Sequence, residues 1–327
     1  MLVRLFSLVS LFFINNIQAQ HTYPIYGGLF ITGAVNIVSI HSASSQSVRI
    51  TNYSDYDTTI NLTANKSVDL MMYKKFFTIS VGSRNTILKR TLFALSSKPI
   101  TITTQNIWGS RANETKLTGL GPSGSYQSIE KANCGSQYVL YHPKTCHDSY
   151  FNSGQYSKTN VYCFTVVAFD DQTAVQFDLN FDTDLGRKFS KTLNKGETIQ
   201  ILLKQPRGKL HIVNGGKITS ADCNKKLAVF SNNFGLGFTT GLNYYNIDKG
   251  VYPFDGIEIE QLHPIKSWGY EFVVASEGKS HVGNTYHLFS YKDNTIWING
   301  KMTIIDKDTV IADTVFYKPL LIQSLKP

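Results

Sequence analysis

The 327-residue chain is predicted to be an all-β protein, built from tandem antiparallel β-sandwich-like modules. The first reason is composition, because the chain is rich in Tyr, Phe, Thr, Val and Ile, which suit strands. The second is that apolar and polar residues alternate over short runs, while helical periodicity is nearly absent. The third is an internal repeat, in which similar strand sequences return three times in the same order. A β-propeller with two blades in each repeat is the alternative that remains open.

The N-terminal residues 1–19 are predicted to form a cleaved secretory signal peptide. Arg4 precedes an apolar run from Leu5 to Ile14, and the small residue Ala19 stands where signal peptidase would cut. The run is shorter than the roughly 20 apolar residues of a membrane-spanning helix, and no later segment reaches that length. We therefore expect a secreted, extracellular protein with no transmembrane segment.

Three phrases make up each unit of the repeat. A strand that begins at glycine comes first, at residues 28–31, 135–140 and 269–274. A hairpin phrase based on Asp-x-Thr follows; it begins at Asp55, Asp171 or Asp293, and its threonine is Thr58, Thr173 or Thr295. A Lys-x-apolar strand ends the unit at residues 98–102, 226–230 and 318–322. Because Asp side chains bond readily to nearby backbone groups, we expect Asp171 and Asp293 to cap hairpin turns.

These phrases divide the mature chain into three predicted β modules, at residues 24–107, 120–234 and 255–327. The third is shorter than the others, and its last predicted strand ends close to the C-terminus. Hydrophobic residues make up 42% of the chain and charged residues 17%, a balance that favours packed cores over disorder. Each module of about 100 residues is then large enough for a core of its own.

Cysteines and glycosylation triplets fit a protein that folds outside the cytosol. An even number of cysteines in a secreted chain predicts disulfide bonds, and the four here are Cys134, Cys146, Cys163 and Cys223. Three connectivities are open, and we favour Cys134 with Cys146 and Cys163 with Cys223. Asn-x-Ser/Thr triplets mark candidate glycosylation sites at Asn52, Asn61, Asn65 and Asn113. Together these features predict a disulfide-bonded glycoprotein.

We predict no catalytic site, no metal site and no cofactor. Asp170 and Asp171 are adjacent and would point to opposite faces of a strand, which disfavours a paired-carboxylate site. The cluster from His142 to Asp148 has two histidines and an acid that suit zinc, but Cys146 within it is expected in a disulfide. A metal-assisted hydrolase stays an alternative that would require bound metal.

Positive charge is confined to the first two modules. Lys and Arg exceed Asp and Glu by 5 in residues 20–106 and by 5 in residues 107–233, whereas residues 234–327 carry a net charge of −2. The candidate ligand-binding residues are Lys74, Lys75, Lys89 and Arg90, because basic side chains attract sulfated glycans, sialylated mucins and acidic membranes. The alternative is that lysines protect strand edges against aggregation. Nucleic acid is not an expected partner, since the chain has no recognised binding motif.

One segment of the chain resembles a known family. Residues 260–273 contain Glu-Gln-Leu-x-Pro and then Trp-Gly-x-Glu-Phe-Val, and the matching residues are Glu260, Gln261, Leu262, Pro264, Trp268, Gly269, Glu271, Phe272 and Val273. With the flanking residues 227–233 and 291–300, this motif resembles the N-terminal domain of the IgG Fc-binding protein family. The layout of residues 24–327 as a whole is similar to one such domain. One departure is that residues 231–258 contain no cysteine, whereas family members commonly have cysteines there.

The resemblance implies a secreted, β-rich binding domain without catalytic machinery. From the residue types alone, the motif is interpreted as structural: Trp268 suits a core, Gly269 permits a φ that other residues resist, and Pro264 stiffens the chain. We therefore expect an extracellular binding or cell-adhesion protein that recognises glycoproteins, with immunoglobulin-like or mucin ligands as the hypothesis. The alternative is a structural component of mucus or extracellular matrix.

Overall fold

The computed structural model describes residues 21–27, 29–30, 34–72, 79–80, 83, 85–108, 123–146, 161–203, 210–236, 255–274, 284–316 and 320–326. These residues form strands, turns and two one-turn 3-10 helices, and the described part of the chain has no α-helix. The predicted all-β fold of sandwich-like modules is confirmed. The predicted signal peptide lies outside the described residues. Within them, no helix has the length and apolarity that crossing a membrane requires.

The first sandwich has two four-stranded antiparallel sheets, ordered β1-β9-β4-β5 and β11-β10-β3-β6. The strands are β1 (His21–Ile25), β3 (Ala34–Ser42), β4 (Gln46–Thr51), β5 (Asp57–Leu62), β6 (Lys66–Met72), β9 (Leu92–Ser96), β10 (Thr101–Trp108) and β11 (Ser123–Gln127). Buried Ile25 and Val48 from one sheet pack against Val38 and Ile102 from the other. Two short strands, β2 (Leu29–Phe30) and β7 (Ile79–Ser80), form a separate parallel pair.

The second sandwich repeats this arrangement, with sheets ordered β12-β17-β14-β15 and β19-β18-β13-β16. The strands are β12 (Gln137–Cys146), β13 (Val161–Ala168), β14 (Thr173–Asp178), β15 (Lys188–Leu193), β16 (Thr198–Leu202), β17 (Leu210–Ser220), β18 (Leu227–Leu236) and β19 (Asp255–Gln261). The predicted alternation is clearest in β14, where Thr173, Val175 and Phe177 are buried and the residues between them are exposed. Helix η2 (Lys131–Asn133) precedes β12, and β8 (Ile87–Leu88) extends the second sheet beside β16.

The third sandwich has the same strand order but fewer strands among the described residues. Its sheets are β20-β25-β22-β23 and β21-β24, and helix η5 (Ile265–Ser267) precedes them. The strands are β20 (Glu271–Val274), β21 (Asn284–Ser290), β22 (Asn294–Ile298), β23 (Lys301–Ile305), β24 (Thr309–Phe316) and β25 (Leu320–Ser324). Among its described side chains the buried hydrophobic residues are Ile296, Ile305, Leu320 and Ile322, which is a smaller core than in the other two sandwiches.

One turn marks the same point of every sandwich. The turn between the fourth and fifth strands contains a residue with left-handed backbone: Asn65 at φ 59°, Gly196 at φ 80° and Asp308 at φ 56°. Its N–H donates to the last carbonyl of the second strand, at 2.8 Å, 3.0 Å and 2.8 Å for Ser42, Ala168 and Ser290. Asn, Gly and Asp are the residues that tolerate this conformation best. The internal repeat is therefore a structural repeat of eight strand positions.

The sequence phrases match this repeat only in part. Asp171 and Asp293 are equivalent, because each carboxylate accepts a backbone N–H from the fourth-to-fifth-strand turn, at 3.0 Å and 2.8 Å. In the first sandwich Ser45 occupies this place and accepts the N–H of Ala64 at 3.0 Å. Asp55 lies instead in the turn between β4 and β5, so the predicted alignment of its phrase is wrong.

The other two phrases are also displaced in one unit each. Residues 98–102 and 226–230 lead into β10 and β18, which occupy the seventh position, but residues 318–322 lead into β25, which occupies the sixth. The predicted last strand of the third unit, β25, is therefore not equivalent to β10 and β18, the predicted last strands of the other two units. The first-position strand of the first sandwich is β1, which lies before residues 28–31 rather than in them.

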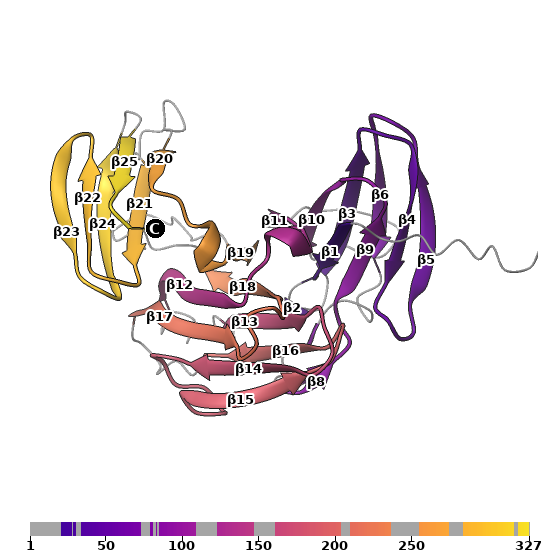
Figure 1. The fold of residues 1–327 in the computed structure, drawn as a ribbon, viewed down its shortest axis with the longest axis horizontal. Coiled ribbons are helices and arrows are strands. Elements are labelled where there is room, and N and C mark those ends of the chain that lie inside the picture. Colours follow the sequence, from indigo (N-terminus) through magenta and orange to yellow (C-terminus); the bar gives the residue numbers. More distant parts are fainter. Residues whose placement is uncertain are drawn as a thin grey trace, which may run out of the picture.

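The three sandwiches follow one another in an arc with the second in the middle (Figure 1). The first and second share a buried aromatic core, in which Tyr26 and Phe93 pack with Phe169 and Phe230. Gln200 of the second sandwich donates from Nε2 to the Tyr26 hydroxyl at 2.8 Å. Strand pairing crosses the predicted module limits, since β11 belongs to a sheet of the first sandwich and β19 to a sheet of the second. The limits 24–107, 120–234 and 255–327 stay a prediction.

Neither predicted disulfide is formed, because Cys134, Cys163 and Cys223 are free thiols. Cys163 lies opposite Asn232 in the β13–β18 pair, whereas Cys223 lies in the turn beyond the far end of that pair. Five residues of strand cover about 16 Å, more than twice the Cα separation of a disulfide. Cys134 precedes β12 and Cys146 ends it, so the length of the strand separates them. The side chain of Cys146 lies outside the described residues.

Candidate functional site

The motif segment, residues 255–274, joins the second sandwich to the third, and Gln261 fixes it in place. Gln261 ends β19 and is only 3% exposed. Its Oε1 accepts the N–H of Ile129 at 2.7 Å, and its Nε2 lies 3.5 Å from the Ile129 carbonyl oxygen and 3.6 Å from Cys134 Sγ. The amide therefore pairs with both backbone groups of one residue in the segment that follows β11.

Pro264 and Gly135 form a second contact between these segments. Pro264 is buried directly above Gly135, where an added Cβ would lie 2.6 Å from the proline Cβ. No side chain fits at that distance, so residue 135 has to be glycine for Pro264 to pack there. Gln261 and Pro264 are thus structural residues, in agreement with the interpretation of the motif.

Trp268 and Gly269 have different roles from those predicted. Trp268 is half-buried and meets the rings of Phe289 and Tyr291 edge-on, at 6.2 Å and 5.5 Å between centroids. Its Nε1 donates to the His263 carbonyl oxygen at 3.3 Å. Gly269 does not have a left-handed φ, and a Cβ there would lie 3.3 Å from the Phe272 ring, a tight contact that favours glycine. Trp268 therefore forms part of the wall of a cavity and is not a core residue.

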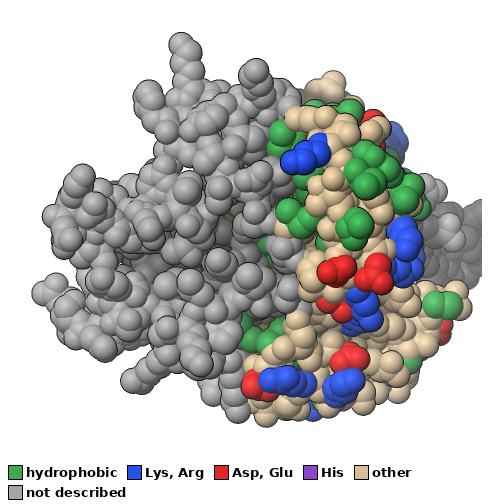
Figure 2. All heavy atoms as spheres, turned by 90° about the vertical axis from the view of Figure 1, so that its left-hand side faces the viewer, with side chains coloured by type: hydrophobic (Ala, Val, Ile, Leu, Met, Phe, Trp, Pro, Cys, Tyr) green, Lys and Arg blue, Asp and Glu red, His purple; other side chains and the backbone are tan. Residues whose placement is uncertain are grey.

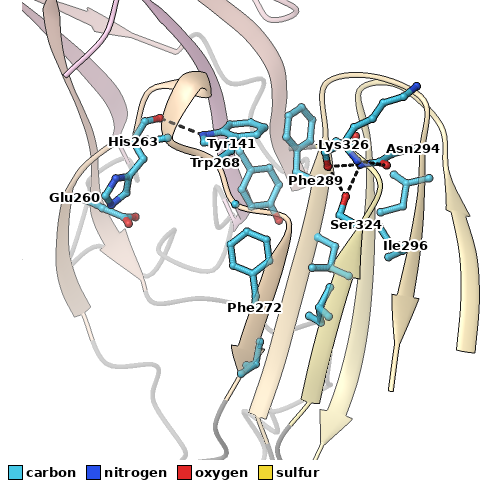
Figure 3. A pocket seen from close by; sticks show the side chains of 17 residues that line it. Tyr141, Glu260, His263, Trp268, Phe272, Phe289, Asn294, Ile296, Ser324 and Lys326 are labelled. Carbon is cyan, nitrogen blue, oxygen red and sulfur yellow. Dashed lines mark hydrogen bonds between the residues drawn. The ribbon is translucent and has the colours of Figure 1, made fainter. Parts of the chain in front are cut away.

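This wall belongs to a cavity of about 650 Å³ between the motif segment and the sheets of the third sandwich, here called the motif cavity (Figure 3). Its lining is mainly apolar and includes Trp268, Phe272, Leu288, Phe289, Ile296 and Ile322. Asn294, which also lines it, is satisfied within the sandwich, because its Nδ2 donates to Ser324 Oγ at 2.8 Å and to the Lys326 carbonyl oxygen at 2.9 Å. A cavity of this kind accepts apolar side chains better than charged ligands.

The opposite surface of the larger sheet, here called the outer face, carries five apolar side chains. They are Val273 on β20, Leu321 on β25, Trp297 on β22, and Met302 and Ile304 on β23, and the polar Glu271, Thr295 and Gln323 lie on the same face. Val273 pairs with Leu321 and Trp297 with Met302 across neighbouring strands, and because Trp297 lies opposite Gln323 of β25, the two apolar pairs are diagonal to each other. Val273 is 73% exposed, Ile304 67% and Met302 60%. Figure 2 faces the side of the molecule that is on the left in Figure 1. It shows hydrophobic side chains gathered over the upper part of the described surface, with most of the charged side chains below them.

The second sandwich provides the equivalent face for comparison. The equivalent strand register places Lys217, Gln176, Ser190 and Thr192 where the third has Leu321, Trp297, Met302 and Ile304. These four positions are therefore polar in the second sandwich and apolar in the third, whereas Val273 corresponds to Val139 and Thr295 to Ala174. Monomeric proteins rarely expose contiguous apolar patches without a partner for them.

Of the predicted basic residues, Lys74 and Lys75 lie outside the described residues. Lys89 is exposed and its Nζ donates to the Tyr53 carbonyl oxygen at 3.3 Å, and Arg90 is half-buried. Arg187, another basic residue of the second module, pairs with Asp182 at 2.7 Å.

The sequons differ in accessibility. Asn52 is fully buried, its Nδ2 donates to Asp55 at 2.6 Å, and its Oδ1 accepts two backbone N–H groups. A glycan on that nitrogen is incompatible with this packing, so Asn52 cannot carry one in the folded protein. Asn61 and Asn65 are exposed, and Asn113 lies outside the described residues.

The side chains of the cluster from His142 to Asp148 lie outside the described residues. Within the residues that are described, no group of three or more His, Cys, Asp or Glu side chains is arranged to hold a metal. Of the two adjacent acids, Asp170 pairs with Lys131 at 2.6 Å, and Asp171 holds the turn already described.

The sequence contains a signal for the outer face that the simple alternation of apolar and polar residues in a strand does not reveal. In β22, Ile296, Trp297 and Ile298 are consecutive apolar residues, and in β23 Met302 and Ile304 fall on the face opposite to Ile305. A hairpin that is apolar on both faces buries one face in the core and leaves the other apolar face on the outside of the sheet.

Comparison with known families gives one result. The family model described as IgGFc binding protein matches residues 125–326, which span β12 to β25 and so the second and third sandwiches. The matched range contains the motif cavity and the outer face. The chain matches no curated protein and no solved structure.

Proposed function

Because the chain belongs to the IgGFc-binding protein family, we propose that it is an extracellular, non-catalytic binding protein whose ligand docks on the outer face of the third sandwich. The family suggests an extracellular binding protein, and the outer face gives that role a place in the molecule. The ligand is a macromolecule, an immunoglobulin-like protein or another glycoprotein, and the setting is a secretion or a cell surface where the contact is adhesive.

One observation carries this proposal: the change from polar to apolar at four equivalent positions between the second sandwich and the third. Both sandwiches have the same strand order, so the fold does not require the change. Exposed apolar side chains such as Met302, Ile304 and Leu321 are stabilised when a partner removes them from water. A protein surface fits such a face better than a sulfated glycan, which binds through charge.

The test is binding of the full chain to immobilised immunoglobulin Fc fragment and to mucin. In the double variant Met302→Ser with Ile304→Thr, each new residue is the one that the second sandwich has at that position. Losing about 1–2 kcal/mol per apolar contact predicts at least a tenfold rise in Kd. The matched control, Ser190→Ala with Thr192→Ala on the second sandwich, should bind as the parent does.

The basic candidates supply the contrasting arm of the experiment. If Lys89→Glu with Arg90→Glu abolishes binding while the outer-face variant leaves it unchanged, the ligand is recognised through charge and the outer face is not the site. Retention no higher than background for every ligand would instead support the alternative, a structural component of mucus or matrix.

A further inference from the structure

Another cavity, of about 690 Å³, lies where the first sandwich meets the motif segment, and it is here called the junction cavity. Three segments of the described chain form its wall: Tyr23 and Ile100 of the first sandwich, the stretch from Gln127 to Asn133, and the part of the motif segment around η5. Most of these side chains are polar, whereas the motif cavity is mainly apolar. Because ligand cavities are usually lined by apolar side chains, a polar lining indicates a ligand with many hydrogen-bonding groups.

The wall offers hydrogen-bonding groups that the fold does not use. Gln127 and Asn133 are exposed, and within the described part of the chain neither side-chain amide has a partner. Glu130 lies between them in the sequence and is held in place, because its Oε1 is 2.8 Å from Nδ1 of His21. An amide both donates and accepts hydrogen bonds, and a carboxylate accepts them. Neighbouring hydroxyl groups of a sugar, each of which donates and accepts, are suited to this set of partners.

Lys266 adds a positive charge to the wall. Its side chain crosses Gly135, where Cε lies 3.5 Å from the position of an added Cβ. The neighbouring ion pair joins Lys131 to Asp170, and Lys266 pairs with no carboxylate among the described residues. Burial, and after it the charge of Lys266, lower the pKa of Lys226, so the two ammonium groups are near each other. An anionic group of a ligand beside Lys266 would relieve this repulsion.

We propose that the junction cavity binds an acidic sugar of a glycan, that is, a ring with several hydroxyl groups and one carboxylate. The carboxylate lies beside Lys266, and the hydroxyl groups form hydrogen bonds with Gln127, Glu130 and Asn133. Ile129, which also lines the cavity, gives the C–H groups of the ring an apolar contact. The contacts are made by side chains on three separate segments, so the site exists only in the folded protein.

The charges of the wall disfavour more strongly anionic ligands. The lining contains one carboxylate, on Glu130, and one ammonium group, on Lys266. A heavily sulfated chain would bring several negative charges close to Glu130, and like charges at short distance repel each other. A sugar with a single carboxylate needs only Lys266 as its counter-charge, and its hydroxyl groups can lie against Glu130 without repulsion.

This site goes beyond the function proposed above and does not rest on it. The junction cavity is formed by the first sandwich and by residues that precede β20, whereas the outer face lies on the larger sheet of the third sandwich. The variant Met302→Ser with Ile304→Thr should therefore bind acidic sugars as the parent protein does. Failure of either proposal is then visible without the other.

The experiment titrates the full chain with 3′-sialyllactose, a hyaluronan tetrasaccharide and lactose, and follows the sugars by NMR. The first two carry a carboxylate, on a sialic acid and on a glucuronic acid, and lactose carries none. We expect at least one acidic sugar to bind saturably, with Kd in the millimolar range and about fivefold below that of lactose, as one ion pair at an exposed lysine predicts. The acidic sugar that binds more tightly identifies the source of the carboxylate.

Two variants at exposed residues test the site from the side of the protein. Lys266→Gln removes the charge and keeps most of the side chain, so it should raise the Kd of the acidic sugar about fivefold and leave that of lactose unchanged. Asn133→Ala should weaken the binding of all three sugars. Lys301→Gln, at an exposed lysine of β23, is the matched control and should bind as the parent does. The proposal is overturned if the acidic sugars bind no better than lactose, if Lys266→Gln keeps the preference for them, or if Asn133→Ala binds like the parent.

Discussion

Replacing Gln261 with methionine tests whether the motif glutamine is a structural anchor. The Gln261 side chain reaches across from β19 and accepts the N–H of Ile129 at 2.7 Å, in a position that is 3% exposed. Methionine has a similar shape and length, so the substitution keeps the packing and removes only the hydrogen bonds.

The expected cost follows from the donor that is left behind. Leaving a buried N–H without an acceptor costs about 1–3 kcal/mol, and because methionine creates no cavity we expect about 2 kcal/mol in total. The first and second sandwiches share their aromatic core and should unfold as one unit of about 240 residues, for which 2 kcal/mol lowers Tm by about 4–8 °C.

Calorimetry of the full chain measures this shift, and Glu260→Gln is the matched control. Glu260 is the neighbouring residue of the same motif and is exposed, so its variant should stay within about 0.5 kcal/mol of the parent. Equal Tm values for the two variants would refute the reasoning, because Gln261 would then contribute nothing to holding the segment.

Two further predictions concern the thiols and one surface ion pair. Cys223 is exposed and should react with a maleimide in the native protein, whereas Cys134 and Cys163 should react only after unfolding, since burial raises the pKa of Cys134 to about 12 and that of Cys163 as well. No native reaction without reductant would show that Cys223 is disulfide-bonded after all. The hydrogen bond from Arg49 lowers the pKa of Asp57 below its unfolded value, so the stabilisation is present above about pH 4 and is lost as the pH falls through the folded pKa. Both side chains are about half exposed, and Asp57→Asn should therefore cost at most about 0.5 kcal/mol at pH 7 and nothing at pH 2, measured by urea unfolding.

The fold class could be predicted because it depends on local patterns. Alternation in β14 reports directly which side chains face the core, and β-branched and aromatic residues favour strands wherever they occur. The repeat was also visible, since Asp171 and Asp293 hold the same turn. The alignment of the first unit fails because Ser45 holds the turn that the aspartates hold in the other two, whereas the phrase that begins at Asp55 lies in a different turn.

The disulfides, the burial of Asn52 and the outer face depend on pairing between distant segments, which residue type alone does not specify. Spacing along the chain suggested disulfides, but strand register places Cys163 and Cys223 at opposite ends of one strand pair. The asparagine in a sequon looks the same whether it is exposed or, like Asn52, buried in a turn. The outer face depends on the strand register, which pairs each of its positions with an equivalent in the second sandwich.

The aromatic core between the first two sandwiches also has a mechanical consequence. Tension along the chain has to shear Tyr26 and Phe93 away from Phe169 and Phe230 before either sandwich can extend alone. The third sandwich resists with a smaller described core, formed by Ile296, Ile305, Leu320 and Ile322, so it should yield first under load. The part of the molecule that carries the outer face is then the part most easily deformed by flow or by pulling.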